Sequence, residues 1–343
     1  MRAAVFVREG VLEIQDRPVP RISDPEEILL EVEACGVCGT DLHILATPPG
    51  HPATPGTILG HEFVGRIVEV GPQVTAFHTG QRVIVDPNLK CGVCRPCRRG
   101  QLNHCENWTT LGIFRDGGFA DVVAVPHRAL HPISEEVPWE EAVWAEILSC
   151  VAASTDRIGI RPGQTAVVIG AGPVGVLHGK LLQASGARVI IADRAAFRLD
   201  VARQVGLELA VDVSDTPLIE AVESWTDGAM ADAVVDAVGN QLDQCLDAAG
   251  TGGTVALFGM NTQAAPAIRQ VEITRKELTV VGSYVGRHAF PRAVELLEMG
   301  VVHPSALITH RLSVDELPGG LEAARRGETM KIVVTQQDGG ITS

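Results

Sequence analysis

The sequence predicts an α/β protein of two domains, one rich in β-strands and one built on a doubly wound parallel sheet. Its 343 residues exceed what a single hydrophobic core usually holds. Before Glu146, alternating apolar and polar runs are separated by proline and glycine, whereas from Gln164 onward strand and helix patterns alternate. Strands that alternate with helices are typical of a parallel sheet covered by helices.

Composition excludes several classes of protein. With 45% hydrophobic and 20% charged residues the chain is globular rather than disordered. Its net charge of −14 disfavours sequence-independent binding to nucleic acid or to an anionic membrane, because both need a basic surface. No apolar run reaches the roughly 18 residues of a membrane span, and the apolar N-terminal run is too short for a signal peptide. We therefore expect a cytoplasmic protein with no nucleic-acid or membrane partner.

The first domain is predicted to hold four strands at residues 28–34, 63–71, 82–87 and 117–125. A short helix is expected to begin at Asp41, since aspartate favours helix starts. A further helix is predicted to begin near Pro138 and to carry Glu146 and Cys150 on one face, four residues apart, before Pro162. The proline- and glycine-rich residues 46–60 predict a surface loop.

Cys38, His61 and Glu62 supply a thiolate, an imidazole and a carboxylate. Zinc takes these three ligand types in a tetrahedral site, and a catalytic site leaves one position for water or substrate. His61 and Glu62 stand at the start of the predicted strand 63–71, which would place them rigidly. The loop at residues 46–60 leads directly into this pair, so we interpret it as a substrate entrance.

A second metal site is predicted at four cysteines within fifteen residues: Cys91, Cys94, Cys97 and Cys105. Gaps of two residues let consecutive cysteines converge on one tetrahedral ion, and an all-thiolate set leaves no position open for chemistry. A zinc ribbon that binds nucleic acid is the functional alternative, which the acidic chain disfavours. We therefore predict two zinc ions per chain, one catalytic and one structural.

The second domain begins with a strand at residues 165–169, a glycine-rich loop and a helix from Pro173 to Gly186. Further strands are predicted at residues 188–193, 233–238, 254–258 and 278–282, with helices between them. A helix at 291–298 and a strand at 330–335 follow, and we expect this tail to return to the first domain. The domains predicted are residues 1–150 with 286–343, and residues 151–285.

The loop after the first of these strands carries the pattern of a dinucleotide-binding site, with Asp193 ending the next strand 23 residues after Gly170. Its predicted cofactor contacts are Gly170, Gly172, Pro173, Val174 and Gly175. Glycines let the backbone approach a pyrophosphate at the helix N-terminus. The Asp193 carboxylate accepts hydrogen bonds from ribose hydroxyls and repels a 2′-phosphate, so we predict NAD rather than NADP. Arg194 and Arg198 weaken that preference, because an arginine beside the acid can pair with the phosphate.

Five motifs, in order along the chain, resemble those of the zinc-containing medium-chain dehydrogenases, which include alcohol, polyol and threonine dehydrogenases. They are residues 38–43, residues 60–62, the four cysteines, residues 170–175 with Asp193, and residues 281–286. The resemblance covers nearly the whole chain. It implies a GroES-like catalytic domain, a Rossmann domain, and zinc-dependent hydride transfer from a polyol or secondary alcohol to NAD, giving a ketone or aldehyde.

The resemblance also implies individual roles. Cys38 and His61 become catalytic zinc ligands, Glu62 a ligand or an exchangeable neighbour, and Glu146 a further ligand that leans the site toward the sorbitol-type branch. Thr40 resembles the hydroxyl that takes the alcohol proton. His43 resembles the imidazole that passes the proton to water.

Departures from the family pattern leave the substrate open. Ile44 stands where sorbitol-type enzymes usually have tyrosine, and we expect Ile44, Leu45 and Trp108 to floor an apolar pocket. An L-threonine 3-dehydrogenase would need an arginine for the carboxylate, for which Arg287 is the candidate; a simple alcohol dehydrogenase is another alternative. A non-catalytic relative of the fold is disfavoured because all the zinc ligands are present. Members of the family oligomerise through the edge of the last Rossmann strands, which implies a homotetramer rather than a homodimer.

Overall fold

The computed structural model describes residues 1–335 and divides the chain into two compact units. One unit is formed by Met1–Ile147 together with the chain from Phe290 onward, and the other by Leu148–Ala289. The predicted C-terminal strand is present as β17 (Lys331–Thr335) and pairs antiparallel with β3 (Glu27–Gly36). The tail therefore completes the sheet of the first unit, as predicted. The last eight residues of the predicted range 286–343 lie outside the described residues.

A seven-stranded sheet organises the first unit, in the order β16-β17-β3-β4-β5-β9, with β8 also pairing with β3. Its remaining strands are β4 (Glu62–Val70), β5 (Arg82–Val85), β8 (Val122–Pro126), β9 (Leu130–Pro132) and β16 (Ile308–Leu312). Two separate pairs join β1 (Arg2–Arg8) to β2 (Val11–Asp16) and β6 (Asn88–Leu89) to β7 (Thr109–Thr110). Apolar residues of β3, including Ile28, Leu30 and Val32, are buried in one shared core.

The helices of the first unit are short. They are α1 (Gly39–Ile44), α2 (Arg95–Arg98), α3 (Trp139–Ala142), α10 (Phe290–Glu298) and α11 (Leu317–Arg325), with 3-10 turns η1 (Leu102–His104), η2 (His127–Ala129), η3 (Pro304–Leu307) and η4 (Val314–Glu316). Helix α4 (Ala145–Ile158) contains the point at which the chain passes from the first unit to the second.

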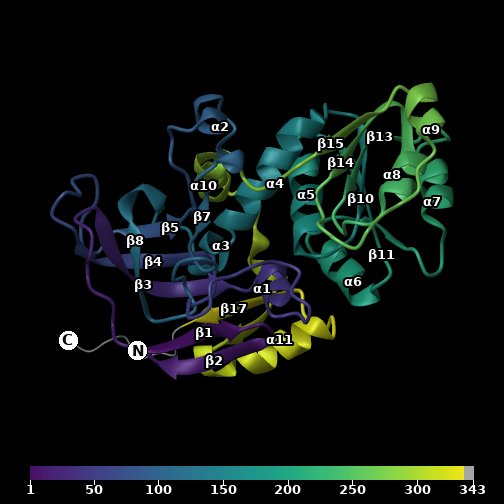
Figure 1. Ribbon diagram of the computed structural model, residues 1–343. Helices are drawn as coiled ribbons and strands as arrows, with labels where there is room; N and C mark the ends of the chain where they lie inside the picture. The colour runs from purple at the N-terminus through teal and green to yellow at the C-terminus, as the bar shows by residue number, and fades with distance from the viewer. Residues whose placement is uncertain (336–343) are drawn as a thin grey trace. The chain divides into compact units, whose positions relative to one another are not determined.

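The second unit is a doubly wound parallel sheet in the order β12-β11-β10-β13-β14-β15, as predicted. Its strands are β10 (Thr165–Ile169), β11 (Arg188–Asp193), β12 (Leu209–Asp212), β13 (Ala231–Asp236), β14 (Ala249–Leu257) and β15 (Thr279–Gly282). Its helices are α5 (Pro173–Ala184), α6 (Ala196–Gln204), α7 (Leu218–Trp225), α8 (Leu242–Ala248) and α9 (Gln270–Arg275). Helices α5 and α6 cover one face of the sheet, and α7 and α8 cover the other (Figure 1).

Several predicted boundaries in the first unit are wrong. The single helix expected from Pro138 is two helices, α3 and α4, separated by Val143 and Trp144. Both of these side chains are buried, so tertiary packing overrides helical periodicity there. The strand expected at residues 117–125 begins only at Val122, because the Gly118 amide donates to Gly60 O at 2.8 Å instead of joining the ladder.

Two further boundaries differ. The first helix begins at Gly39 rather than Asp41, because Asp41 caps it from the third helical position by accepting a hydrogen bond from the Cys38 amide. Strand β14 begins at Ala249, earlier than the predicted residue 254, since glycines within it obscure the apolar pattern.

Candidate functional site

The ligand atoms of Cys38, His61 and Glu62 all lie within 4.8 Å of one another. Cys38 is the N-cap of α1, while Glu62 is the first residue of β4 and His61 directly precedes it. Two elements that are 23 residues apart in sequence therefore bring a thiolate, an imidazole and a carboxylate together.

Gly60 makes this convergence possible. Its φ of +92° lies in the left-handed region, and a Cβ there would approach Cys35 Sγ to 2.7 Å and the Phe119 ring to 2.8 Å. Only glycine combines this backbone conformation with such close packing. The turn it permits directs the chain into His61 and the start of β4.

The cluster contains buried polar atoms that lack hydrogen-bond partners. They include His61 Nδ1, Glu62 Oε1 and Asp41 Oδ1, although Asp41 Oδ1 lies 3.7 Å from His61 Nδ1. Burial by itself would lower the pKa of His61, but its electrostatic and hydrogen-bond interactions with Cys38 and Asp41 raise that pKa well above its usual value. A buried pocket that favours a positive charge, with unpartnered nitrogen and oxygen donors and a thiol, fits a zinc ion.

Lys331 is a member of this site that the sequence did not reveal. Its ammonium group forms a fully buried ion pair with Glu62 Oε2, donates to Val37 O at 3.0 Å and lies 5.2 Å from the centre of the Trp144 ring. Glu62 thus offers one oxygen toward the cluster while the other is held by Lys331. A lysine inside the apolar strand β17 was the one available signal, since a buried lysine needs a partner.

The predicted proton-transfer residues lie on α1 beside the cluster. The Cys38 thiol donates to Thr40 Oγ1 at 3.6 Å, and Thr40 is partly buried. His43, one turn further on, is exposed. Glu146 lies in the first turn of α4 and is partly buried, but it is not one of the residues whose ligand atoms converge on Cys38. Its place as a ligand stays a prediction.

The four cysteines of the predicted structural site also converge, with all four sulfur atoms within 4.8 Å of one another. Cys105 Sγ lies 3.5 Å from Cys91 Sγ and 3.9 Å from Cys94 Sγ, and all four cysteines are free of disulfides. Hydrogen bonds from Val93, Asn107 and Cys94 lower the pKa of Cys91 to about 6.

Burial and the neighbouring thiols raise the pKa of Cys97 to about 12. Four crowded sulfur atoms therefore cannot all ionise without a cation among them. This donor set fits a closed tetrahedral zinc site.

In the second unit, the glycine-rich loop connects β10 to α5 as predicted. Gly170 has φ +103°, and a Cβ at Gly175 would collide with the carbonyl oxygen of Gly170. Gly172 is the N-cap of α5 and Pro173 and Val174 are its first two residues. The loop thus turns tightly and leaves the N-terminal amides of α5 available to an anion.

Asp193 ends β11 and contacts this loop. Its Oδ2 accepts a hydrogen bond from the Ala171 amide at 2.8 Å, and its Oδ1 accepts one from the Ala195 amide at 2.9 Å. Arg198 Nη1 lies 4.0 Å from Asp193 Oδ2, whereas Arg194 is exposed. Of the two arginines predicted to influence cofactor choice, Arg198 therefore lies beside the acid in the structure.

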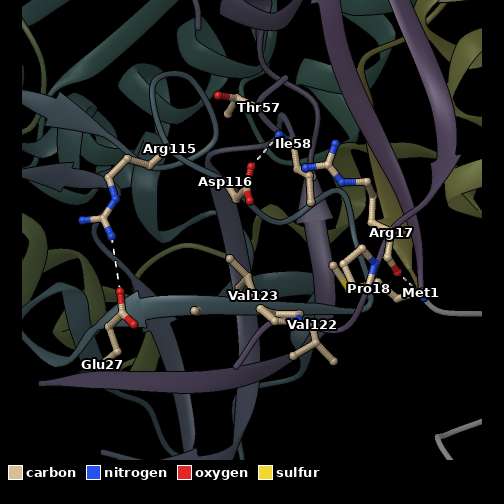
Figure 2. Close-up of a pocket in the computed structure, with 12 residues that line it drawn as sticks. Met1, Arg17, Pro18, Glu27, Thr57, Ile58, Arg115, Asp116, Val122 and Val123 are labelled. Atoms are coloured by element: carbon tan, nitrogen blue, oxygen red, sulfur yellow. Dashed lines mark hydrogen bonds and ion pairs between the residues drawn. The ribbon is translucent and has the colours of Figure 1, made fainter. Parts of the chain in front are cut away.

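A cavity of about 460 Å³ lies elsewhere on the first unit (Figure 2). Its lining includes neither Cys38 nor the His61–Glu62 pair. Its carboxylates are engaged by protein donors, since Asp116 accepts from the Ile58 amide at 2.9 Å and Glu27 lies 3.4 Å from Arg115. This cavity is therefore separate from the metal cluster.

Comparison with known proteins identifies the family. The alcohol dehydrogenase GroES-like domain matches residues 24–135, and the zinc-binding dehydrogenase domain matches residues 173–299. The chain belongs to the zinc-containing medium-chain alcohol and polyol dehydrogenases. It is an oxidoreductase that depends on zinc and a nicotinamide cofactor.

Individual relatives match nearly the whole length of the chain. L-threonine 3-dehydrogenase of Sinorhizobium medicae is 34% identical over 97% of this chain and 98% of its own. Sorbitol dehydrogenase of Halalkalibacterium halodurans is 32% identical over 98% of this chain and 100% of its own. A zinc-binding dehydrogenase of Sinorhizobium meliloti 1021, solved bound to NADP, has a TM-score of 0.93 and 32% identity, covering 98% of this chain and 99% of its own.

The structure corrects the prediction for two of the residues expected to line the substrate pocket. Ile44 and Leu45 are buried in the hydrophobic core of the first unit, so the prediction that they floor a pocket is wrong. Trp108 is partly buried and donates from Nε1 to Thr110 Oγ1 at 2.8 Å. Arg287 lies in the second unit, where its Nε is buried without a hydrogen-bond partner.

Among residues 1–335, none of the helices combines the length and apolar character that crossing a bilayer requires.

Proposed function

We propose that this enzyme oxidises a polyol or a secondary alcohol to the ketone or aldehyde and transfers the hydride to NAD. The observation that carries the proposal is the convergence of Cys38, His61 and Glu62 beside the hydroxyl of Thr40. Relatives named as sorbitol, D-arabinitol and D-altritol dehydrogenases support the polyol class.

The metal roles follow from the donor sets. Cys38 and His61 would hold the catalytic zinc, with Glu62 or Glu146 as a further ligand, and the four cysteines would hold a structural zinc. The catalytic zinc would supply Lewis acidity toward the substrate oxygen, and the nicotinamide would accept the hydride. The pairing of Glu62 with Lys331 supports Glu146 as the alternative carboxylate, because Glu62 already has a buried partner.

Proton removal is assigned to α1. Thr40 Oγ1 accepts the substrate hydroxyl proton, and His43 passes it to water, for which an exposed imidazole is suited because it can both accept and donate a proton. Thr40 and Cys38 are partly buried and His61 is buried, which limits the access of bulk water to the first of these transfers.

NAD is the proposed cofactor because the Asp193 carboxylate lies beside the loop that approaches the dinucleotide. A relative solved with NADP, together with Arg194 and Arg198, makes NADP the competing choice. Gly170, Gly172, Pro173, Val174 and Gly175 would contact the pyrophosphate through their backbone.

We also propose a homotetramer, with a homodimer as the alternative. Strand β15 ends the sheet of the second unit, and its Thr279 and Val280 are exposed. An unpaired edge of this kind can extend antiparallel into a second copy. The cytoplasmic location expected from the sequence stays a prediction.

L-threonine 3-dehydrogenase is the second candidate activity. Such enzymes are among the most similar relatives, and the unpartnered Nε of Arg287 offers a donor for a carboxylate. A simple alcohol dehydrogenase is a third candidate.

The test is turnover of the zinc-loaded enzyme with NAD and, separately, NADP, against sorbitol, xylitol, 2,3-butanediol, 2-butanol, ethanol and L-threonine. We expect activity on polyols or secondary alcohols. Activity confined to L-threonine or to ethanol would replace the proposed substrate class.

The variant Cys38→Ser tests the metal site directly. It should abolish turnover and lower the zinc content while NAD binding, measured by fluorescence titration, is retained. Full activity in this variant would remove Cys38 from the metal site.

A further inference from the structure

The loop at residues 46–60 carries an imidazole that the proposed chemistry leaves unused, that of His51. The residue before it, Gly50, donates its amide to His43 O at 2.9 Å. A Cβ at Gly50 would lie 3.4 Å from His43 Cβ, so the loop backbone packs directly on α1. His51 therefore stands one residue beyond a fixed contact with the proton-transfer helix.

The opposite side of the loop is anchored as well. The Thr54 amide donates to Ile113 O at 3.1 Å, and the His51 ring packs on Phe114 with the ring centres 6.3 Å apart at a tilt of 36°. Held between α1 and the segment after β7, the partly buried imidazole has a restricted orientation.

One nitrogen of this ring is already used. His51 Nδ1 lies 2.8 Å from Pro52 O. A carbonyl oxygen only accepts, so Nδ1 carries the proton and donates, which leaves Nε2 as an acceptor. The loop thus presents a hydrogen-bond acceptor for a group that carries a proton, such as a hydroxyl.

Partial burial is the main cause that lowers the pKa of His51, and the charges of His61 and His43 lower it further, against the opposing effects of Pro52 O and Asp41. A neutral imidazole in this position favours a hydroxyl over a carboxylate, which has no proton to donate.

We propose that His51 Nε2 accepts a hydrogen bond from a second hydroxyl of the substrate and so selects diols and polyols over mono-alcohols. This inference rests on the proposed function, since it names the substrate class of the same site. It assigns His51 to substrate binding, whereas Thr40 and His43 move the proton.

The test compares 2,3-butanediol with 2-butanol, which share a carbon skeleton and differ by one hydroxyl, using the zinc-loaded enzyme and NAD. His51→Phe keeps a ring against Phe114 but removes the acceptor. We expect it to lower kcat/KM for the diol about tenfold, as loss of one hydrogen bond does, and to change that for 2-butanol by less than about twofold. His51→Gln, which retains an acceptor, should restore part of the diol activity.

His78→Phe is the matched control, because His78 Nδ1 also lies near the carbonyl of the next residue, at 3.1 Å from Thr79 O, in an exposed turn. His78→Phe should leave kcat/KM unchanged for both 2,3-butanediol and 2-butanol. Zinc content should be the same in all variants, and a lower content in His51→Phe would overturn the assignment by making His51 part of the metal site. Equal effects of His51→Phe on both substrates, or none, would overturn it as well. Absence of turnover of every polyol and secondary alcohol tested with the wild type would instead overturn the proposed function.

Discussion

At the scale of single residues, the geometry of the site depends on the ion pairs that its buried charged groups form. Glu62 and Lys331 form an ion pair from which water is excluded, with side chains 0% and 2% exposed. Removing one member of a buried pair leaves the other charge uncompensated, which costs far more than an exposed pair contributes. Lys331 therefore stabilises the fold, and its ion pair also fixes the orientation of the Glu62 carboxylate toward the metal cluster.

Replacing Lys331 with methionine should lower the free energy of unfolding by about 3–5 kcal/mol, because Glu62 then remains buried without its partner. Urea unfolding at fixed metal content measures the change. The double variant Lys331→Met with Glu62→Gln should recover part of the loss, since no buried charge remains. A single variant as stable as the wild type would show that the pair does not stabilise the fold.

Asp193 determines cofactor choice at the same scale. Asp193→Ser should raise the ratio of kcat/KM with NADP to that with NAD by about tenfold or more, equivalent to about 1.4 kcal/mol, because charge repulsion disappears while Arg198 remains adjacent. Asp193→Asn is the control for structure, since its side-chain oxygen can still accept from one of the amides of Ala171 and Ala195. An unchanged ratio in both variants would remove Asp193 from this role.

At the scale of elements, α5 joins cofactor binding to the core of the second unit. Its fifth to seventh residues, Leu177 to Gly179, are buried, and His178 among them donates from Nδ1 to Val174 O at 2.9 Å. His178 Nε2 is buried without a partner, and the ring packs edge-on against Phe258 with centres 4.8 Å apart. The imidazole is thus held in its neutral form within a helix that the core requires.

This burial predicts a pH dependence of stability. Burial lowers the pKa of His178 to about 4 from an ordinary 6.5, so the unfolded state binds the proton first as the pH falls. Above about pH 6.5 the titration of His178 does not change the free energy of unfolding. Between about pH 6.5 and 4 it lowers this free energy progressively, by about 2 kcal/mol at pH 5.

His178→Leu, which cannot titrate, should not show this part of the loss. Urea unfolding of both proteins at pH 7.5 and pH 5 isolates it, because the other titrating groups are common to both. An identical pH dependence would contradict the assignment.

At the scale of the whole molecule, the sheet of the second unit has two ends. Strand β15 forms one and β12 the other. An exposed edge strand is a template for a further strand, and proteins that must stay separate usually block it with charge. Val280 on β15 is 37% exposed and carries no charge, which favours association at this edge.

Val280→Lys should shift the protein toward smaller species in sedimentation velocity, because a lysine on each strand opposes pairing of two copies. Val213→Lys is the matched control: Val213 follows β12 at the opposite end of the sheet and has the same 37% exposure. Equal shifts in both variants, or none, would place the subunit contact elsewhere.

The parts of the molecule whose chemistry is local could be predicted from the amino-acid sequence. The four cysteines, the glycine loop with Asp193, and Cys38 with His61 lie within short segments or at fixed positions beside strands, and these spacings constrain the backbone directly. The parallel sheet followed from the alternation of strands and helices, and the order of its strands agrees with it.

The contacts between groups far apart in the sequence depend on tertiary packing. Glu62 and Lys331 are 269 residues apart, and no periodicity relates them. The same holds for His51, whose loop has no regular pattern and is placed by contacts with α1 and Phe114. Ile44 and Leu45 were predicted to line a pocket because they follow a metal ligand in the sequence, but both side chains are buried in the core. Burial and pairing depend on the whole chain, so spacing along the sequence cannot specify them.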